Sequence, residues 1–126
     1  MKLSKELGLM LYWGEGDKTG KYFIALTNTD LKVLQYFVAW IKKYFDIDEK
    51  RLKGRLYIWN NINDLEAKKF WSKELKIPVS QFTKSYVSKS IPNIRKRRHG
   101  FGVCRVSYGS KEIFKEIKEG IVKNFH

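Results

Sequence analysis

The chain has 126 residues, enough for one folded domain with a sizeable core. Hydrophobic residues make up 43% of it and aromatic residues 15%, which excludes a disordered polyelectrolyte. The 26 Lys and Arg side chains outnumber the 13 acidic ones, so the net charge is +13. A polyanionic partner, most often nucleic acid, offsets such a charge. A ribosomal-type packing role or a lysine-rich proteome is the alternative explanation.

Cysteine and histidine are scarce. Cys104 is the single cysteine, so no disulfide forms within the chain, and two histidines cannot complete a four-ligand zinc site. The apolar run at 7–13 is too short for a signal peptide and lacks a small-residue cleavage site. No stretch reaches membrane-spanning length. We therefore expect a soluble, cytoplasmic protein with no membrane contact and no small-molecule substrate.

The chain opens with a predicted helix and a predicted hairpin. Ser4 is a suitable N-cap, residues 7–13 are apolar on almost every side, and Gly14 and Gly16 are expected to stop the helix. Residues 21–28 are strand-like and follow a Lys-Thr-Gly turn. We expect them to form a tight hairpin with residues 15–18.

A second helix and an alternating strand follow. After Thr29 and Asp30, apolar residues recur at helical spacing on one face up to Phe45. Residues 51–59 alternate with a period of two, which predicts a strand with a core face and a basic, aromatic outer face. The outer positions hold Arg51, Lys53, Arg55, Tyr57 and Trp59, without an acid among them. A sheet laid on DNA would present such a face.

The second half of the chain has the same mixed character. A third helix is predicted at about 63–76, where Asn63 and Glu66 form a capping-box pattern. Strands are expected at 81–88 and 101–108, and a last helix after Ser110. Helices and strands thus alternate without a linker or repeat, which predicts a single α+β domain over residues 1–126.

Most of the excess charge lies in one segment. Residues 75–111 hold nine basic and no acidic side chains. The densest part, residues 91–100, contains Pro92, Asn93 and Gly100 and is therefore expected to be an exposed loop. Its basic side chains are predicted to contact phosphates: Arg95, Lys96, Arg97 and Arg98.

The first predicted helix is the segment in which we expect a catalytic site. A helix that is apolar all round must be covered on more than one side, and a second copy of the same helix is a plausible cover. Small residues at Gly8 and Gly14 would permit close backbone approach. Packing about a two-fold axis would bring both Glu15 carboxylates together, which requires a neutralising cation. The helix C-terminal dipoles add to the attraction, so the pattern indicates a divalent-metal site for phosphodiester hydrolysis.

These residues resemble a known family. Gly8–Gly16 (Gly-Leu-Met-Leu-Tyr-Trp-Gly-Glu-Gly) resembles the LAGLIDADG motif, with Glu15 at the catalytic acidic position. Three further stretches are similar to a subgroup of single-motif LAGLIDADG-like proteins: residues 26–30, 70–72 and 102–106. The resemblance covers nearly the whole chain.

The resemblance implies a homodimeric homing-endonuclease type of enzyme that cleaves a long, partly palindromic site in double-stranded DNA. It implies an antiparallel, saddle-shaped sheet in the major groove, backed by helices, with residues 63–76 as an inserted helix. The expected cofactor is Mg²⁺ or Mn²⁺, held by Glu15 and Gly14. The catalytic residues would be Glu15 and Lys84, and the dimer interface would comprise Gly8, Leu11, Tyr12 and Gly14. Expected DNA contacts outside the basic loop are Lys18, Lys21, Asn28, Arg51, Lys53, Arg55, Tyr57, Lys89 and Arg105.

Two other functions fit the same pattern. Met10 stands where the family often has a small residue, and Trp13 replaces a frequent acid. A non-cleaving DNA-binding transcription regulator on the same fold, like bacterial sporulation regulators with a degenerate motif, is one alternative. An RNA-binding, maturase-like protein is the other, because net charge does not separate DNA from RNA. The retained Glu15 favours the nuclease over the regulator.

Overall fold

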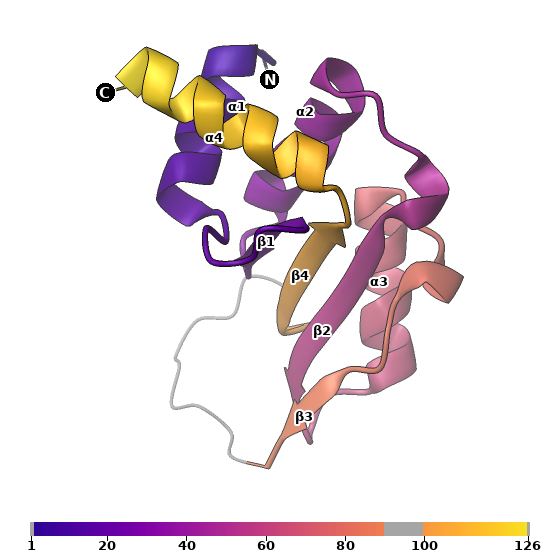
Figure 1. Ribbon diagram of the computed structural model, residues 1–126. Helices are drawn as coiled ribbons and strands as arrows, with labels where there is room; N and C mark the ends of the chain where they lie inside the picture. Colours follow the sequence, from indigo (N-terminus) through magenta and orange to yellow (C-terminus); the bar gives the residue numbers. More distant parts are fainter. Residues whose placement is uncertain (1, 90–99, 126) are drawn as a thin grey trace.

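The computed structural model describes residues 2–89 and 100–125 (Figure 1). These residues form an α+β fold of four α-helices, a four-stranded sheet and two short 3₁₀ turns. The elements in chain order are α1 (Lys5–Glu15), β1 (Ile24–Asn28), α2 (Leu31–Tyr44), η1 (Glu49–Arg51), β2 (Lys53–Trp59), α3 (Asp64–Leu75), η2 (Val79–Gln81), β3 (Tyr86–Ser88), β4 (Val103–Tyr108) and α4 (Lys111–Phe125).

The sheet is open and mixed. Its strand order is β1-β4-β2-β3, with β4 antiparallel to both β1 and β2. The pair β2 and β3 is parallel, so the expectation of an antiparallel sheet was wrong at this edge. A parallel neighbour requires a crossover connection, and α3 lies between these two strands in the chain and supplies it. The helix interpreted from sequence as an insertion is therefore the element that sets the direction of β3.

Helix ends follow the local signals in the sequence. The predicted cap side chains each accept a hydrogen bond from a backbone N–H of the first turn: Ser4, Asn63 and Ser110. Asp30 caps α2 in the same way, although it was not predicted as a cap. Such caps satisfy N–H groups that have no partner within the helix. At the other end of α1, Gly16 donates its N–H to the Tyr12 carbonyl, so the stop predicted at Gly16 is confirmed, whereas Gly14 lies within the helix.

The buried core joins the inner face of the sheet to side chains from all four described helices. The predicted alternation of β2 is confirmed, since Gly54, Leu56 and Ile58 are buried and the residues between them face outward. In Figure 1, α3 lies behind and to the right of β2. Among the buried side chains that the helices bring to this core are Leu34, Phe37, Val38 and Ile41 from α2, and Ala67, Trp71 and Leu75 from α3.

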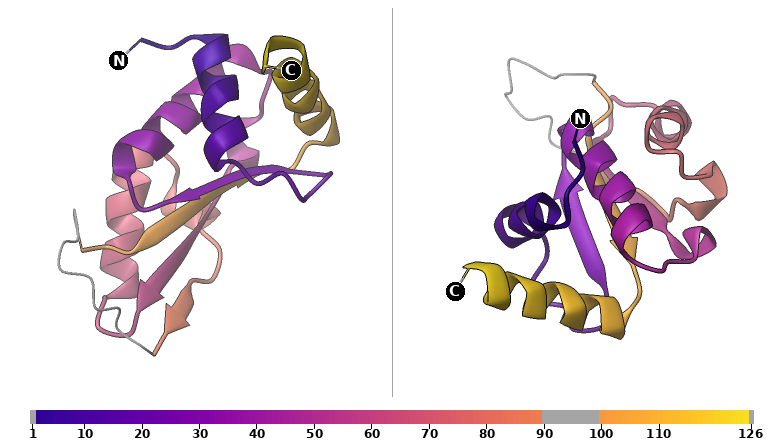
Figure 2. Two further views of the ribbon diagram at one scale, coloured as in Figure 1. Left: turned by 90° about the vertical axis from the view of Figure 1, so that its left-hand side faces the viewer. Right: turned by 90° about the horizontal axis from the view of Figure 1, so that it is seen from above.

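The first and last helices, α1 and α4, lie at the same end of the molecule (Figure 2). On one side, α1 meets α2 so closely that a Cβ at Gly8 would lie 2.0 Å from the Trp40 ring. On another side it meets α4, where the Trp13 and Phe125 rings stack with centroids 5.3 Å apart. Two of the apolar sides of α1 are therefore covered by the chain itself.

Three predicted elements differ from those observed. The strand expected at 81–88 is reduced to Tyr86–Ser88, since Gln81 belongs to the η2 turn and Phe82 forms only an isolated bridge with Gly54. The expected hairpin exists as a short bridge, in which Gly16 pairs with Leu26. Arg51 lies in η1 and not on the strand. In the part of the chain that the structure describes, no helix is long and apolar enough to cross a membrane.

Candidate nucleic-acid interface

The outer face of the sheet is basic and aromatic. Lys53 and Arg55 on β2 are exposed, and Tyr57 and Trp59 on the same strand are half-buried. Tyr86 on the neighbouring β3 is 56% exposed, and its ring centroid lies 6.1 Å from that of Tyr57. None of the four described strands contains an acidic residue. The face therefore combines cations with flat apolar surfaces, the combination that binds phosphates and bases.

Two arginines stand side by side at the centre of this face. Arg55 and Arg105 are directly opposite each other in the antiparallel register of β2 and β4. Like charges placed opposite one another in a sheet are destabilising unless something neutralises them. The Arg55 guanidinium lies over the Tyr57 ring, 5.7 Å from its centroid. Arg105 lies over the Phe23 ring at 5.3 Å and also has a carboxylate partner.

That partner is Asp17, in the loop between α1 and β1. Its Oδ2 lies 3.4 Å from Nη2 of Arg105, and its Oδ1 accepts hydrogen bonds from the backbone N–H and the hydroxyl of Thr19. The two Thr19 hydrogen bonds, and then Arg105, hold the pKa of the Asp17 carboxyl below its ordinary value. Asp17 therefore stays ionised and forms a fixed link between the hairpin loop and the sheet face.

The end of α1 is joined to this link. The Tyr12 hydroxyl donates to the Asp17 carbonyl at 2.5 Å and accepts from the Ala25 N–H at 3.1 Å. Tyr12 is 1% exposed, and burial raises the pKa of its hydroxyl to about 12. Its proton therefore remains in place at neutral pH. Neither Asp17 nor Phe23 was predicted, because no local pattern indicates their contacts with Arg105, which in the case of Asp17 is 88 positions away.

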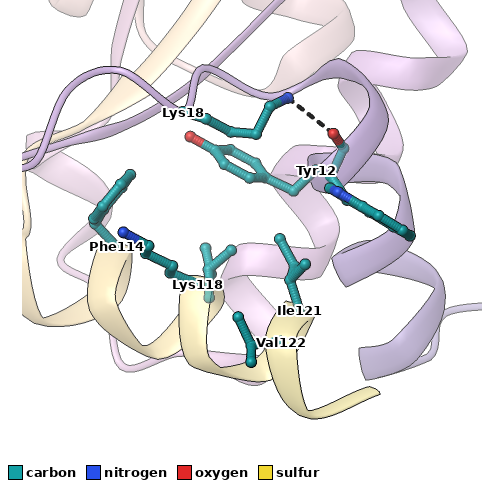
Figure 3. A pocket seen from close by; sticks show the side chains of 8 residues that line it. Tyr12, Lys18, Phe114, Lys118, Ile121 and Val122 are labelled. Carbon is teal, nitrogen blue, oxygen red and sulfur yellow. Dashed lines mark hydrogen bonds between the residues drawn. The ribbon is translucent and has the colours of Figure 1, made fainter. Parts of the chain in front are cut away.

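Glu15 is the last residue of α1 and is exposed to solvent. A Cβ built on Gly14 would meet no atom within 4 Å, so a ligand has room to approach this end of the helix. The Lys18 ammonium is already there, donating to the Trp13 carbonyl at 2.8 Å and the Gly16 carbonyl at 3.0 Å (Figure 3). A cation at a helix C-terminus is favoured by the partial negative charge of the last carbonyls. Lys18 was expected to contact DNA, and here it caps the helix.

A cavity of about 180 Å³ lies beside Lys18, between α1 and α4. Figure 3 shows Phe114, Ile121 and Val122 of α4 around it, with Lys118 at its wall. The described residues that line it include no carboxylate, histidine or cysteine, so they offer no group for metal binding. The exposed carboxylate of Glu15 lies outside this lining.

The residues at the end of α1 fit a divalent metal only in part. The Glu15 carboxylate and the Gly14 carbonyl are oxygen donors, which Mg²⁺ prefers. Among the described residues, however, no group of three or more His, Cys, Asp or Glu side chains converges. The described part of one chain therefore does not assemble three such side chains around Glu15, and a metal site here would need further ligands, such as those of a second copy of the chain.

Two of the four residues expected at the dimer interface of α1 are buried within the chain. Gly8 and Tyr12 are buried against the chain's own core and do not face outward. The outward side of the helix instead presents Leu7 at 49% exposure and Met10 at 53%, with Leu11 half-buried and Gly14 exposed. The sequence pattern identified an apolar helix correctly but did not show which side α2 would cover.

The other predicted site residues fall into three groups. Lys21, Lys84 and Lys89 are exposed. Two expected DNA contacts are engaged within the chain, since Asn28 accepts from the Asp30 N–H and Arg51 donates to the Gly109 carbonyl with its guanidinium over the Tyr108 ring. The predicted phosphate contacts of the basic loop lie outside the described residues: Arg95, Lys96, Arg97 and Arg98.

The two predicted catalytic side chains are not brought together within one chain. Glu15 precedes Gly16, which bridges to the β1 edge of the sheet. Lys84 follows Thr83, which bonds to Gly54 of β2, and precedes the opposite edge strand β3. Glu15 and Lys84 therefore belong to opposite edges of the sheet.

Comparison of the chain with protein-family models, with curated proteins and with solved structures gave no match. The candidate interface therefore rests on the chain's own residues and geometry.

Proposed function

We propose that the protein binds double-stranded DNA through the outer face of its sheet. The observation that carries this proposal is the pair Arg55 and Arg105, set opposite each other on strands that contain no acid. Their mutual repulsion is relieved when a polyanion binds across them. Flat aromatic side chains beside the pair, Tyr57 and Tyr86, add surface for sugar and base contacts.

The test is a binding titration with three unrelated polymers: duplex DNA, duplex RNA and single-stranded DNA. We expect the tightest binding to duplex DNA, with log affinity falling linearly as log salt rises, because bound lysines and arginines release counterions. The double variant Arg55→Ala with Arg105→Ala should lose most of this binding. Wild-type protein that prefers duplex RNA would support the RNA-binding alternative, and salt-independent binding would overturn the proposal.

We further propose a LAGLIDADG-like homodimer that cleaves the bound DNA. The order of helices and strands and the exposed Glu15 at the end of α1 support this, together with the exposed apolar side chains Leu7 and Met10 on the same helix. Pairing of two α1 helices would bury these side chains and bring two Glu15 carboxylates together. Glu15 and Gly14 of both copies would hold Mg²⁺, which when bound polarises a phosphodiester for attack by water.

Glu15→Gln tests the cleavage step. We expect it to abolish cleavage of a plasmid library in Mg²⁺ or Mn²⁺ while leaving DNA binding nearly intact, because the carboxylate lies outside the basic sheet face. Glu6→Gln, an exposed acid in the first turn of the same helix, is the matched control. Cleavage by the Glu15→Gln variant at the wild-type rate would exclude Glu15 as a catalytic residue. Binding without any cleavage by the wild type would favour the transcription regulator.

Met10→Lys tests the dimer. A charge in the middle of the exposed apolar side of α1 should yield a monomer, because it cannot be buried against a second copy without a partner. Light scattering at micromolar concentration measures the outcome directly. A wild-type protein that is monomeric both with and without DNA would remove the shared-carboxylate site.

A further inference from the structure

The two arginines at the centre of the sheet face are held differently. Arg105 has a carboxylate partner in Asp17, and its side chain is 26% exposed. The side chain of Asp17 is itself only 23% exposed. Arg55 is exposed and lies over an aromatic ring on its own strand. Arg105 is thus the more constrained of the two, with one edge of its guanidinium on Asp17 and one face on Phe23.

The side chain and the backbone of Asp17 are both held in place by hydrogen bonds. Its Oδ1 is occupied by the two hydrogen bonds from Thr19, so only Oδ2 is directed at the arginine. Its backbone is fixed at both ends, since its N–H donates to the Ala25 carbonyl and its carbonyl accepts from the buried Tyr12 hydroxyl. The carboxylate is therefore a rigid support and not a mobile counterion.

An acid at this place works against general attraction to DNA. Generic phosphate binding rises with every positive charge and falls with every negative one, so a face that served only that purpose would gain from losing Asp17. A fixed guanidinium has a different advantage. It loses little conformational freedom when it makes two parallel hydrogen bonds, and the O6 and N7 atoms of guanine accept such a pair in the major groove.

We infer that Asp17 is a positioning residue that holds Arg105 for two-pronged recognition of a guanine in the bound duplex. This inference rests on the proposed function, because it assumes that DNA lies on the outer face of the sheet. It assigns base selection to Arg105 and to a loop residue that itself touches no DNA.

The experiment is a selection from a duplex DNA library randomised at its central positions, followed by sequencing of the bound fraction. We expect wild-type protein to enrich a guanine at a fixed position in each half-site. Asp17→Asn keeps an Oδ1 acceptor for Thr19 but removes the charge that holds Arg105. It should reduce the guanine preference about tenfold or more, the discrimination expected of one bidentate pair. Its affinity for duplexes of only A·T pairs should stay equal or rise.

Two further variants separate positioning from folding and from charge. Arg105→Lys keeps the charge but not the planar fork, so it should lose the guanine preference and keep the salt dependence of the wild type. Asp46→Asn removes an exposed acid between α2 and η1 and should change neither quantity. Loss of the preference in both Asp17→Asn and Arg105→Lys, but not in Asp46→Asn, supports the inference.

The failure of this inference differs from the failure of the proposed function. If wild-type protein binds duplex DNA without selecting guanine, or if Asp17→Asn keeps the full preference, Arg105 is not positioned for base reading and only the inference falls. A fall in affinity of Asp17→Asn for every sequence by the same factor also overturns it, since that result indicates a structural role. If wild-type protein binds no duplex DNA, the proposed function and the inference fall together.

Discussion

The two faces of the same strands differ completely in character. On β2 and β4 the inner positions Leu56, Cys104 and Val106 are fully buried. The positions next to them, Arg55 and Arg105, face outward and carry like charges opposite one another. The inner face stabilises the fold by removing apolar surface from water. The outer face buries less apolar surface, and one of its two paired arginines, Arg105, is balanced by Asp17 within the chain.

This difference teaches how to separate folding from function in one strand. Neighbouring residues of β2 serve opposite purposes because successive side chains point to opposite faces. A change at an even-numbered position there should alter the free energy of unfolding. A change at an odd-numbered one should alter binding and leave stability nearly unchanged.

The largest expected effect comes from breaking the inner face. Leu56→Ala should lower the free energy of unfolding by about 2–5 kcal/mol, because the fully buried side chain leaves a cavity between the sheet and its helices. Urea denaturation measures the change. Arg55→Ala, one position away, is the control and should stay within about 0.5 kcal/mol of the wild type. Equal losses from the two variants would show that the faces are not distinct.

The basic segment at residues 95–98 should contribute to generic attraction and not to sequence preference. Replacing Lys96, Arg97 and Arg98 together by Ala should weaken binding to all duplexes by similar factors. The slope of log affinity against log salt should flatten by about 0.9 for each phosphate that the variant no longer neutralises. An unchanged slope combined with an altered base preference would mean that this segment reads bases and that the sheet does not.

A single charge on the outer face should have a more selective effect. Arg55→Ala should relax the preference at one symmetric pair of positions, at a cost of about 1–3 kcal/mol for the preferred base. Competition between the selected duplex and single-base variants of it measures this cost. A uniform loss for every competitor would assign Arg55 to the phosphate backbone instead.

At low pH, protonation of Asp17 beside the outer face should lower the free energy of unfolding. The folded-state pKa of Asp17 is lowered, so its contribution is fully present above the ordinary carboxyl value of 3.8 and is lost as the pH falls through the folded value. Asp17→Asn should therefore flatten the acid limb of the curve of stability against pH. Thermal unfolding of both proteins over the acid range measures the effect, and coincident acid limbs would show that the carboxylate contributes nothing.

At high pH the buried Cys104 thiol on the inner face should limit stability. Burial raises the pKa of the Cys104 thiol from 9.0 to about 12, so the folded protein keeps a proton that the unfolded chain releases. Its contribution is present below pH 9 and declines as the pH rises towards 12. Cys104→Ser should reduce this decline, as measured by unfolding above neutral pH. Rapid alkylation of the thiol in the folded protein would contradict its burial.

Much of the fold could be predicted from short-range patterns. Three features follow from hydrogen bonds within a few residues and from side-chain direction along one strand: the caps at Ser4, Asn63 and Ser110, the stop of α1, and the alternation of β2. The exposed position of Glu15 at the end of α1 follows from the same local signals. These features depend on neighbours in sequence, so the sequence alone was sufficient for them.

The tertiary structure decided what depends on distant neighbours. Only the packing of α1 against Trp40 shows that Gly8 allows the close approach of α2 and that Leu7 and Met10 face outward. Only the crossover through α3 makes β3 parallel to β2. The link from Tyr12 through Asp17 to Arg105 joins a helix, a loop and a strand far apart in the chain. No local periodicity encodes such contacts, because they form only when the whole core places the three elements together.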